Sequence, residues 1–242
     1  MSSPALPHSL WREPEHEQQL TWPTLQLRDV FKIYRSGPTE TVALRGLEMK
    51  IEEGEFVAVL GPSGCGKSTM LVLAAALDEP SAGEVRVNGR PLQQLDELER
   101  SRYRARELAL IFQSDNLWPL LSARENVALA LRLAGAEDPG READDALATF
   151  GLGQRTRHTA AALSGGEQQR VAIASAFARG APLVLADEPT GELDASNEMI
   201  VLEALARLRS ERGSTVVLVT HSAQVAAAAD RVIEMRDGTA IS

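Results

Sequence analysis

Apolar and polar residues alternate along two stretches near the start of the chain. Residues 25–33 and 42–51 follow this pattern, and a turn-like segment, Arg35-Ser-Gly-Pro38, lies between them. Alternation with a period of two is typical of a strand with one buried face, so we expect two antiparallel strands here. Residues 83–89 form a further short alternating strand closed by Asn-Gly. Together these segments predict an antiparallel β unit.

A different pattern begins after residue 163, where apolar strands alternate with helical stretches. Such alternation predicts a parallel sheet covered by helices, with ligands at the carboxyl ends of its strands. The apolar runs 56–60 and 108–112 are also expected to be strands. The remaining expected elements are helices at 70–77, 94–107, 166–179, 197–212 and 223–229, and strands at 183–186, 215–219 and 231–235.

Two helical stretches in the middle of the chain, 123–134 and 141–150, are separated by Gly135-Ala-Glu-Asp-Pro-Gly140. Glycine and proline at this point separate two helices, and we expect an inserted helical lobe over roughly residues 114–162. At the other end, residues 1–23 carry four prolines among polar and acidic residues and have no sustained periodicity. We interpret them as a mobile N-terminal extension of a domain formed by residues 24–242.

Composition narrows the class of protein. The formal net charge of −9 argues against nucleic acid as the main partner, because proteins that bind phosphate backbones normally carry a basic excess. The single cysteine, Cys65, cannot form an intramolecular disulfide and fits a reducing, cytosolic compartment. No apolar run approaches the roughly 18 residues of a membrane span, so we expect neither a secreted nor an integral membrane protein.

A glycine-rich segment lies between the strand expected at 56–60 and the helix that follows. It fits the pattern G-x-x-x-x-G-K-[ST], in which backbone N–H groups and a helix N-terminus surround an anion. Lys67 is expected to reach the β- and γ-phosphates of a nucleotide, Ser68 to bind Mg²⁺ and Thr69 to donate to a further phosphate oxygen. A glycine-rich turn without a ligand is the alternative. The expected phosphate-binding residues are Gly61, Ser63, Gly64, Cys65, Gly66, Lys67, Ser68 and Thr69.

Polar side chains follow three other predicted strands. Asp187 would hold Mg²⁺, usually through water, and Glu188 would orient or polarise the attacking water of a nucleotide hydrolase. Acidic capping around Pro189 is the alternative for these two acids. His221 can touch a γ-phosphate or position the water, and Gln113 can offer its amide oxygen to Mg²⁺. The sequence therefore predicts a hydrolytic site at one edge of the sheet.

A second segment with anion-binding features is Leu163-Ser-Gly-Gly-Glu-Gln-Gln-Arg170. Ser164 opens a helix, with Glu167 three residues later as in a capping box. The N–H groups of Gly165 and Gly166 also form an anion site. Two phosphate-binding helix starts in one chain suggest that two copies share each nucleotide, whereas a capped helix alone is the alternative. The spacing leaves both interpretations open.

In this order the motifs resemble those of the ATP-binding subunits of ABC transporters, over residues 25–242. The resemblance implies an α/β fold: a P-loop NTPase core with a mostly parallel sheet, an antiparallel β subdomain and an inserted α-helical subdomain. It also implies an ATPase that uses ATP and Mg²⁺. The matching elements are the Walker A loop 61–69, Gln113 of the Q-loop, the signature 163–167, the Walker B acids Asp187 and Glu188, the D-loop 191–194 and the switch residue His221.

The subfamily and further site residues also follow from the resemblance. Residues 42–47, 112–117, 125–127 and 186–191 are similar to the macrolide-exporter, lipoprotein-release and cell-division ABC ATPases, whose membrane partners work by mechanotransmission. In such a protein an aromatic A-loop residue stacks on adenine, the signature meets the γ-phosphate bound by the opposite protomer, and the D-loop lies along the same interface. The corresponding residues here are Tyr34 for the first role, Ser164, Gly165 and Gly166 for the second, and Asp194 for the third.

The resemblance implies two partners, a second copy of the chain and a separate transmembrane permease, and places the subunit on the cytoplasmic face of the membrane. We expect the permease to contact residues 114–134, where 117–121 form either a docking patch or core packing between lobes. A soluble ABC ATPase acting on DNA or ribosomes is less favoured, because of the acidic charge and the absence of coiled-coil or zinc insertions. A regulatory complex that moves no solute is a third hypothesis, which only the partner distinguishes from transport.

Overall fold

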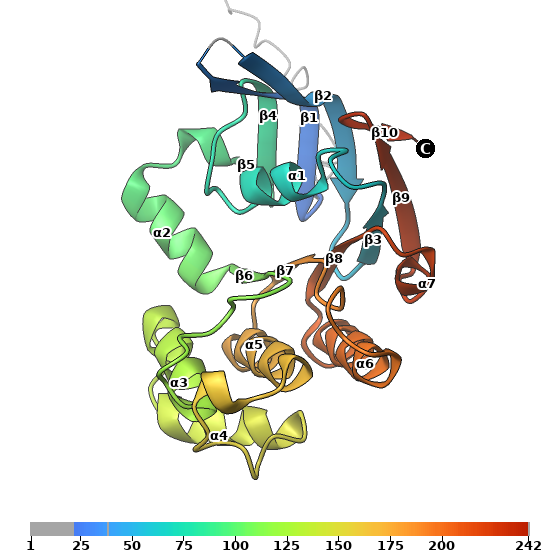
Figure 1. The fold of residues 1–242 in the computed structure, drawn as a ribbon. Helices are drawn as coiled ribbons and strands as arrows, with labels where there is room; N and C mark the ends of the chain where they lie inside the picture. The colour runs from blue at the N-terminus through green and yellow to red at the C-terminus, as the bar shows by residue number, and fades with distance from the viewer. Residues whose placement is uncertain (1–21, 38, 242) are drawn as a thin grey trace, which may run out of the picture.

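The computed structural model describes residues 22–37 and 39–241 of the chain (Figure 1). Almost all of the expected extension, residues 1–23, lies outside the described residues, so its mobility stays a prediction. Within the described part, two sheets and their helices form the α/β fold that the sequence predicts.

The smaller sheet is antiparallel and forms the upper part of Figure 1. It consists of β1 (Leu25–Ser36), β2 (Thr39–Ile51), β4 (Ala82–Val87) and β5 (Arg90–Pro91). The strand order is β2-β1-β4-β5, so β1 pairs with β2 on one side and with β4 on the other. The three alternating segments thus form one antiparallel unit, with the two-residue strand β5 added at its edge.

The larger sheet is parallel except at one edge. It consists of β3 (Phe56–Leu60), β6 (Leu108–Ile111), β7 (Leu183–Asp187), β8 (Thr215–Thr220), β9 (Arg231–Arg236) and β10 (Thr239–Ile241). Their order is β10-β9-β3-β8-β7-β6, and only β10 runs antiparallel to its neighbour. Because parallel strands end at the same edge, the residues after β3, β6, β7 and β8 come together there.

Helices lie on both faces of the larger sheet, and α3 and α4 pack on each other and against α5 at one end of the molecule (Figure 1). The helices are α1 (Lys67–Ala74), α2 (Glu97–Arg106), α3 (Ala123–Ala134), α4 (Pro139–Thr149), α5 (Gly165–Arg179), α6 (Ala195–Arg212) and α7 (Ala223–Ala226). Two short 3₁₀ turns cover Leu92–Gln94 and Ala160–Ala162. Within residues 22–37 and 39–241, none of the helices combines the length and apolarity that crossing a bilayer requires.

The central strands divide their side chains between two hydrophobic cores. Val57 and Val217 belong to the core shared with α1 and the antiparallel sheet, whereas Phe56 and Val216 belong to the core under α3, α5 and α6. Successive residues of a strand point to opposite faces, and both faces here are covered, which explains why these strands read as continuous apolar runs. Packing on both faces of the sheet thus fixes the position of its carboxyl edge.

Helix boundaries follow the capping residues. Helix α3 spans the predicted residues because Ser122 and Glu125 form a capping box before it and Gly135 adopts a left-handed conformation after it. Helix α1 begins at Lys67, three residues earlier than predicted, because its N-cap is Gly66, which has no side chain to mark the start. Helix α7 ends at residue 226, where 229 was predicted, and is a single turn.

Candidate functional site

The glycine-rich loop runs from β3 directly into α1 and is packed closely against neighbouring strands. Gly64 and Gly66 have φ of 79° and 104°, a left-handed region that favours glycine. A Cβ on Gly66 would lie 2.5 Å from the carbonyl oxygen of Ala43, and one on Gly61 would lie 2.3 Å from that of Met235. The loop therefore needs glycine at these positions, both for its backbone conformation and for its close approach to β2 and β9.

Two side chains fill the inside of this loop. Lys67 is 5% exposed, and its Nζ donates to the carbonyl oxygens of Gly61 at 2.7 Å and Pro62 at 2.9 Å. Cys65 is likewise 5% exposed, with its Sγ 2.7 Å from where a Cβ on Gly61 would lie. The ammonium of Lys67 thus lies beside the loop backbone. A phosphate bound in the loop would offer this ammonium a charged acceptor in place of the two neutral carbonyl oxygens.

Asp187 ends β7 with an unused acceptor. Its Oδ1 is buried and has no hydrogen-bond partner within the part of the chain that the structure describes. Burial raises the pKa of the Asp187 carboxyl and the charge of Glu188 adds to this rise, while the Ser68 hydroxyl and the Lys67 ammonium lower the pKa. A buried carboxylate oxygen without a partner, beside a serine hydroxyl, is an oxygen donor set that fits Mg²⁺.

Glu188 and His221 form a close pair at the same edge. His221 Nδ1 lies 2.5 Å from Glu188 Oε2, and the backbone N–H of Glu188 donates to the carbonyl of Val219 at 2.9 Å. Glu188 has a φ of 46°, which is uncommon for a residue with a side chain and costs about 1–3 kcal/mol. The hydrogen bond to Val219 of β8 ties the Glu188 backbone to the neighbouring strand, and the carboxylate lies beside the imidazole.

The Q-loop after β6 is tied to the helix that follows the signature. Gln169 of α5 is 3% exposed, and its Nε2 donates to the carbonyl oxygens of Phe112 at 2.9 Å and Gln113 at 2.6 Å. Asn116 donates to Gln169 Oε1 at 3.1 Å and accepts from the N–H of Phe112 at 2.7 Å. The Gln113 side chain donates to Glu192 Oε1 at 3.4 Å, so it reaches the loop that follows β7.

The signature and the D-loop lie side by side at the starts of α5 and α6. Ser164 and Glu167 form the expected capping box, and hydrogen bonding to Ser164 is the main cause of the lowered pKa of Glu167. Asp194 caps α6 by accepting from the N–H of Asn197 at 2.9 Å. A Cβ on Gly166 would lie 2.6 Å from Asn197 Oδ1. Glycine at position 166 thus allows the two helix starts to approach each other.

Tyr34 is an exposed aromatic residue near the end of β1. Its side chain is 40% exposed, and Lys32 Nζ lies 4.9 Å from the centre of its ring. Lys32 in turn pairs with Asp78 at 2.7 Å. A tyrosine with this exposure is not a core residue, and its ring is available for stacking on a base.

Most of the predicted site residues meet at the carboxyl edge of the larger sheet. The loop 61–69, Gln113, Asp187, Glu188 and His221 follow β3, β6, β7 and β8 at this edge. The signature residues are an exception, since no hydrogen bond within the described ranges joins Ser164, Gly165 or Gly166 to the loop. Figure 1 shows the start of α5 in the other half of the molecule from α1. The sequence analysis singled out neither Gln169, which lies two residues after the signature 163–167, nor Asn197, which lies three residues after the D-loop 191–194.

The fold and these groups define a P-loop nucleotide-binding protein with acids and a histidine placed for hydrolysis. The chain belongs to the ABC transporter family, whose family model, described as ABC transporter, matches residues 44–191. It is an ATP-binding subunit of the ABC type that hydrolyses ATP with Mg²⁺.

Individual relatives agree with this assignment. The chain is 44% identical over 216 residues to an uncharacterized ABC transporter ATP-binding protein, MJ1508, of Methanocaldococcus jannaschii, covering 88% of this chain and 96% of that protein. It is 44% identical over 218 residues to the macrolide export ATP-binding/permease protein MacB of Marinobacter nauticus. That match covers 89% of this chain but 34% of MacB, so the chain spans about a third of that relative.

A solved structure shows the same fold. The dimeric post-hydrolysis state of the ATP-binding cassette MJ0796, bound to ADP and Pi, superposes with a TM-score of 0.83 at 40% identity. The match covers 90% of this chain and 97% of that one. The predicted fold class and the predicted resemblance to the macrolide-exporter and lipoprotein-release type are therefore confirmed.

Proposed function

We propose that two copies of this chain close head to tail around two ATP molecules and transmit closure and opening to a separate membrane permease. The observation that carries this proposal is the division of the phosphate-binding groups. The P-loop and the signature belong to different halves of one copy, and no hydrogen bond between described residues joins them. A second copy in head-to-tail arrangement supplies the missing half at each of two equivalent sites. The relatives named above favour this role over that of a soluble ABC ATPase.

In each site this chain's own residues divide the work of phosphoryl transfer. Lys67 binds the phosphates, and the signature N–H groups of the other copy bind the γ-phosphate from the opposite side. Glu188 accepts a hydrogen bond from the attacking water and orients it, and His221 fixes the position of the Glu188 carboxylate. Asp187, Ser68 and Gln113 would hold Mg²⁺, which neutralises phosphate charge when it is bound.

The membrane partner is proposed to dock on residues 114–134. Trp118 is 67% exposed and Leu120 is 87% exposed, which favours a docking patch over core packing for residues 117–121. Gln169 ties this segment to the signature helix through Gln113 and Asn116. Movement at the patch would therefore be transmitted to the signature. We also propose that the subunit lies on the cytoplasmic face of the membrane, where it has access to both ATP and the permease.

ATP-dependent dimer formation tests the proposal. Glu188→Gln should bind ATP without turnover, and light scattering should show a dimer with ATP and a monomer with ADP, because only the γ-phosphate bridges both halves. Ser164→Arg introduced into Glu188→Gln should abolish the dimer and leave ATP binding in place.

Ser122→Arg is the matched control, because it removes an equivalent capping box from α3 while leaving the signature intact. It should keep the ATP-dependent dimer. A monomer of Glu188→Gln at saturating ATP, or equal loss of the dimer with both arginine substitutions, would contradict the composite site.

A further inference from the structure

The start of α5 carries a carboxylate close to its proposed anion site. Glu167 lies in the first turn of this helix, and its Oε2 accepts from the backbone N–H of Ser164 at 2.9 Å. The N–H groups of a first turn have no partner within their helix, so those of Gly165 and Gly166 can donate to a γ-phosphate. A phosphate bound there would lie within about one helical turn, or about 5 Å, of the Glu167 carboxylate.

This carboxylate is ionised at neutral pH. The hydrogen bond from the backbone N–H of Ser164 is the main cause that lowers the pKa of Glu167, and the Ser164 hydroxyl and the Arg155 guanidinium lower it further, while burial opposes them. A separation of about 5 Å is shorter than the screening length of about 8 Å at physiological ionic strength. An uncompensated Glu167 would therefore repel a phosphate that approaches the signature.

Arg155 provides the compensating charge. Its Nε donates to Glu167 Oε1 at 2.9 Å, so each carboxylate oxygen has its own donor, and its Nη1 lies 3.4 Å from His158 Nε2. The Arg155 side chain is 49% exposed and that of Glu167 is 17% exposed. An ion pair with one exposed partner contributes little to the stability of the fold. What the pair does change is the charge that the signature presents to a nucleotide.

The turn that carries Arg155 is itself held in place. The backbone N–H of Arg155 donates to the carbonyl of Leu152 at 2.8 Å, and the N–H of His158 donates to the carbonyl of Arg155 at 2.9 Å. Leu152 is fully buried in the core under α3 and α5. The guanidinium therefore projects from a fixed backbone, and little freedom is lost when it pairs with Glu167.

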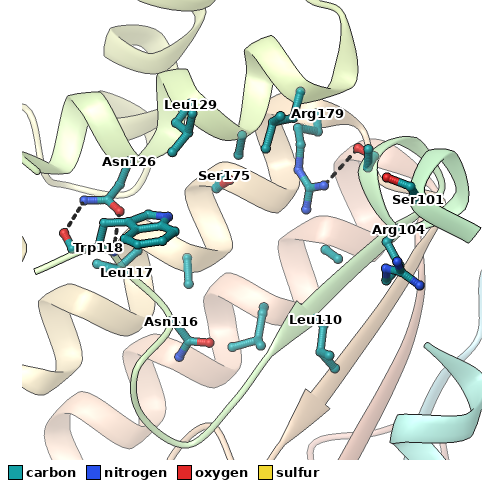
Figure 2. A pocket seen from close by; sticks show the side chains of 16 residues that line it. Ser101, Arg104, Leu110, Asn116, Leu117, Trp118, Asn126, Leu129, Ser175 and Arg179 are labelled. Carbon is teal, nitrogen blue, oxygen red and sulfur yellow. Dashed lines mark hydrogen bonds between the residues drawn. The ribbon is translucent and has the colours of Figure 1, made fainter. Parts of the chain in front are cut away.

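The same turn is anchored on α3. The carbonyls of Thr156 and His158 accept from the N–H groups of Arg124 and Ala123 at 3.0 and 2.9 Å. Within the same helix, Asn126 lines the pocket shown in Figure 2. The ion pair thus connects a turn that is bonded to the first residues of α3 with the first turn of α5.

We propose that Arg155 is a positioning residue of the composite ATP site. It holds the Glu167 carboxylate in the capping box and offsets its charge, so that the signature of one copy can approach the γ-phosphate bound by the other. This inference rests on the proposed function, because the signature meets a nucleotide only in the head-to-tail pair. Arg155 acts through Glu167, so its loss should matter only while residue 167 carries a charge.

The test is a double-mutant cycle in the full-length chain with Glu188→Gln and saturating ATP, in which sedimentation measures the Kd of the dimer. Arg155→Gln should raise this Kd about tenfold, because it leaves a carboxylate uncompensated in each of two sites. Arg155→Lys should recover part of the loss, because the positive charge stays. With Glu167→Gln also present, Arg155→Gln should change the Kd by about twofold or less.

Arg90→Gln is the control for the removal of an exposed ion pair. Arg90 donates to both carboxylate oxygens of Glu107, at 2.8 and 2.9 Å, and its side chain is 44% exposed. The pair lies at β5 and the end of α2, away from the signature, so this substitution should leave the Kd of the dimer unchanged. Thermal unfolding of every variant shows whether the fold is kept.

Three outcomes would overturn the inference: an unchanged Kd in Arg155→Gln, an equal loss with Glu167 and with Glu167→Gln, or the same loss in Arg90→Gln. The second of these would mean that Arg155 acts independently of the carboxylate. A monomer of Glu188→Gln at saturating ATP, with no other substitution, would contradict the proposed function as well. A dimer that does not depend on Arg155 would contradict this inference alone.

Discussion

Glu188 is the residue whose local structure bears most directly on the chemistry. Its carboxylate meets His221 at 2.5 Å, and its backbone has a positive φ. A side chain held in an uncommon backbone conformation is typical of functional sites, where the surrounding structure compensates the strain. The adjacent Asp187 faces the loop through Ser68 and Lys67. Two neighbouring acids of one strand end therefore have different surroundings and different proposed roles.

The first prediction separates binding from hydrolysis. Lys67→Ala should weaken ATP binding by about tenfold or more, because it removes the positive charge that binds the phosphates. Glu188→Gln should keep ATP binding but lower turnover by about a hundredfold or more, because the amide cannot act as a base toward water. Equilibrium binding of labelled ATP and steady-state phosphate release measure the two effects. Turnover of Glu188→Gln at the unmodified rate would exclude the proposed role of Glu188.

The second prediction concerns Tyr34, the exposed residue proposed to stack on adenine. Tyr34→Ala should raise the KM for ATP several-fold, with kcat nearly unchanged, because stacking contributes equally to the ground and transition states. Tyr34→Phe should behave like the unmodified chain, since it keeps the aromatic face. A loss of thermal stability without a change in KM would instead indicate a structural role.

At the scale of elements, a single buried amide connects the Q-loop to the signature helix. Gln169 bonds two backbone carbonyls of the Q-loop and also accepts from Asn116. A buried polar side chain with all of these partners fixes the position of one segment on another. The connection runs from the proposed docking segment to the helix that begins at Ser164.

The third prediction tests this connection. Gln169→Leu should lower the free energy of unfolding by about 2–3 kcal/mol, because it removes the bonds that the buried amide donates to the carbonyls of Phe112 and Gln113 and the one that it accepts from Asn116. Gln168→Leu is the control on the same helix, since the half-buried Gln168 side chain makes a single hydrogen bond among the described residues, to the carbonyl of Leu163 at 3.1 Å. Urea denaturation of the two variants measures the difference. Equal effects of the two substitutions would show that the Q-loop contacts contribute little.

The sequence predicts elements well where local signals mark them. Ser122 with Glu125 before α3 and Gly135 after it locate both ends of that helix. The short strands β5 and β10 are not predictable in this way, because two or three residues show no periodicity. Their pairing depends on neighbours that are distant in the chain or joined by a tight turn.

The residues of the candidate site likewise fall into those that a local motif marks and those that depend on distant contacts. Spacing alone predicts roles for Lys67, Asp187 and Glu188, since each belongs to a motif with a physical requirement. The role of Gln169 depends on contacts with residues more than fifty positions away, and the packing of Gly166 on Asn197 depends on how α5 and α6 meet. Such contacts arise only once the strands have paired, so periodicity carries no signal for them.

At the scale of the whole molecule, the proposed site is assembled from two incomplete halves. One copy holds the P-loop, the acids and the histidine at one sheet edge, and it presents the signature elsewhere. In a symmetric head-to-tail pair each copy contributes a different half to each site. Activity should therefore depend on which residues are paired across the interface.

The fourth prediction uses this division. Lys67→Ala and Ser164→Arg should each be inactive alone, but a mixture of the two should regain about a quarter of the unmodified activity. Half of the dimers in an equal mixture are mixed pairs, and in each of these one site carries both defects while the other carries neither. Phosphate release from the mixture measures the gain. A mixture as inactive as its components would indicate that both groups act within one copy.

The position of Cys65 gives the protein a chemical reporter of its own. The chain has a single thiol, and this thiol is packed under the backbone of the loop that is proposed to hold the phosphates. A thiol-specific reagent can react only when the loop opens locally, so the labelling rate measures the free energy of that opening. ATP should slow the labelling, because it stabilises the closed loop. The labelling rate of one native side chain would thus report how often the empty loop opens in each copy, without any introduced probe.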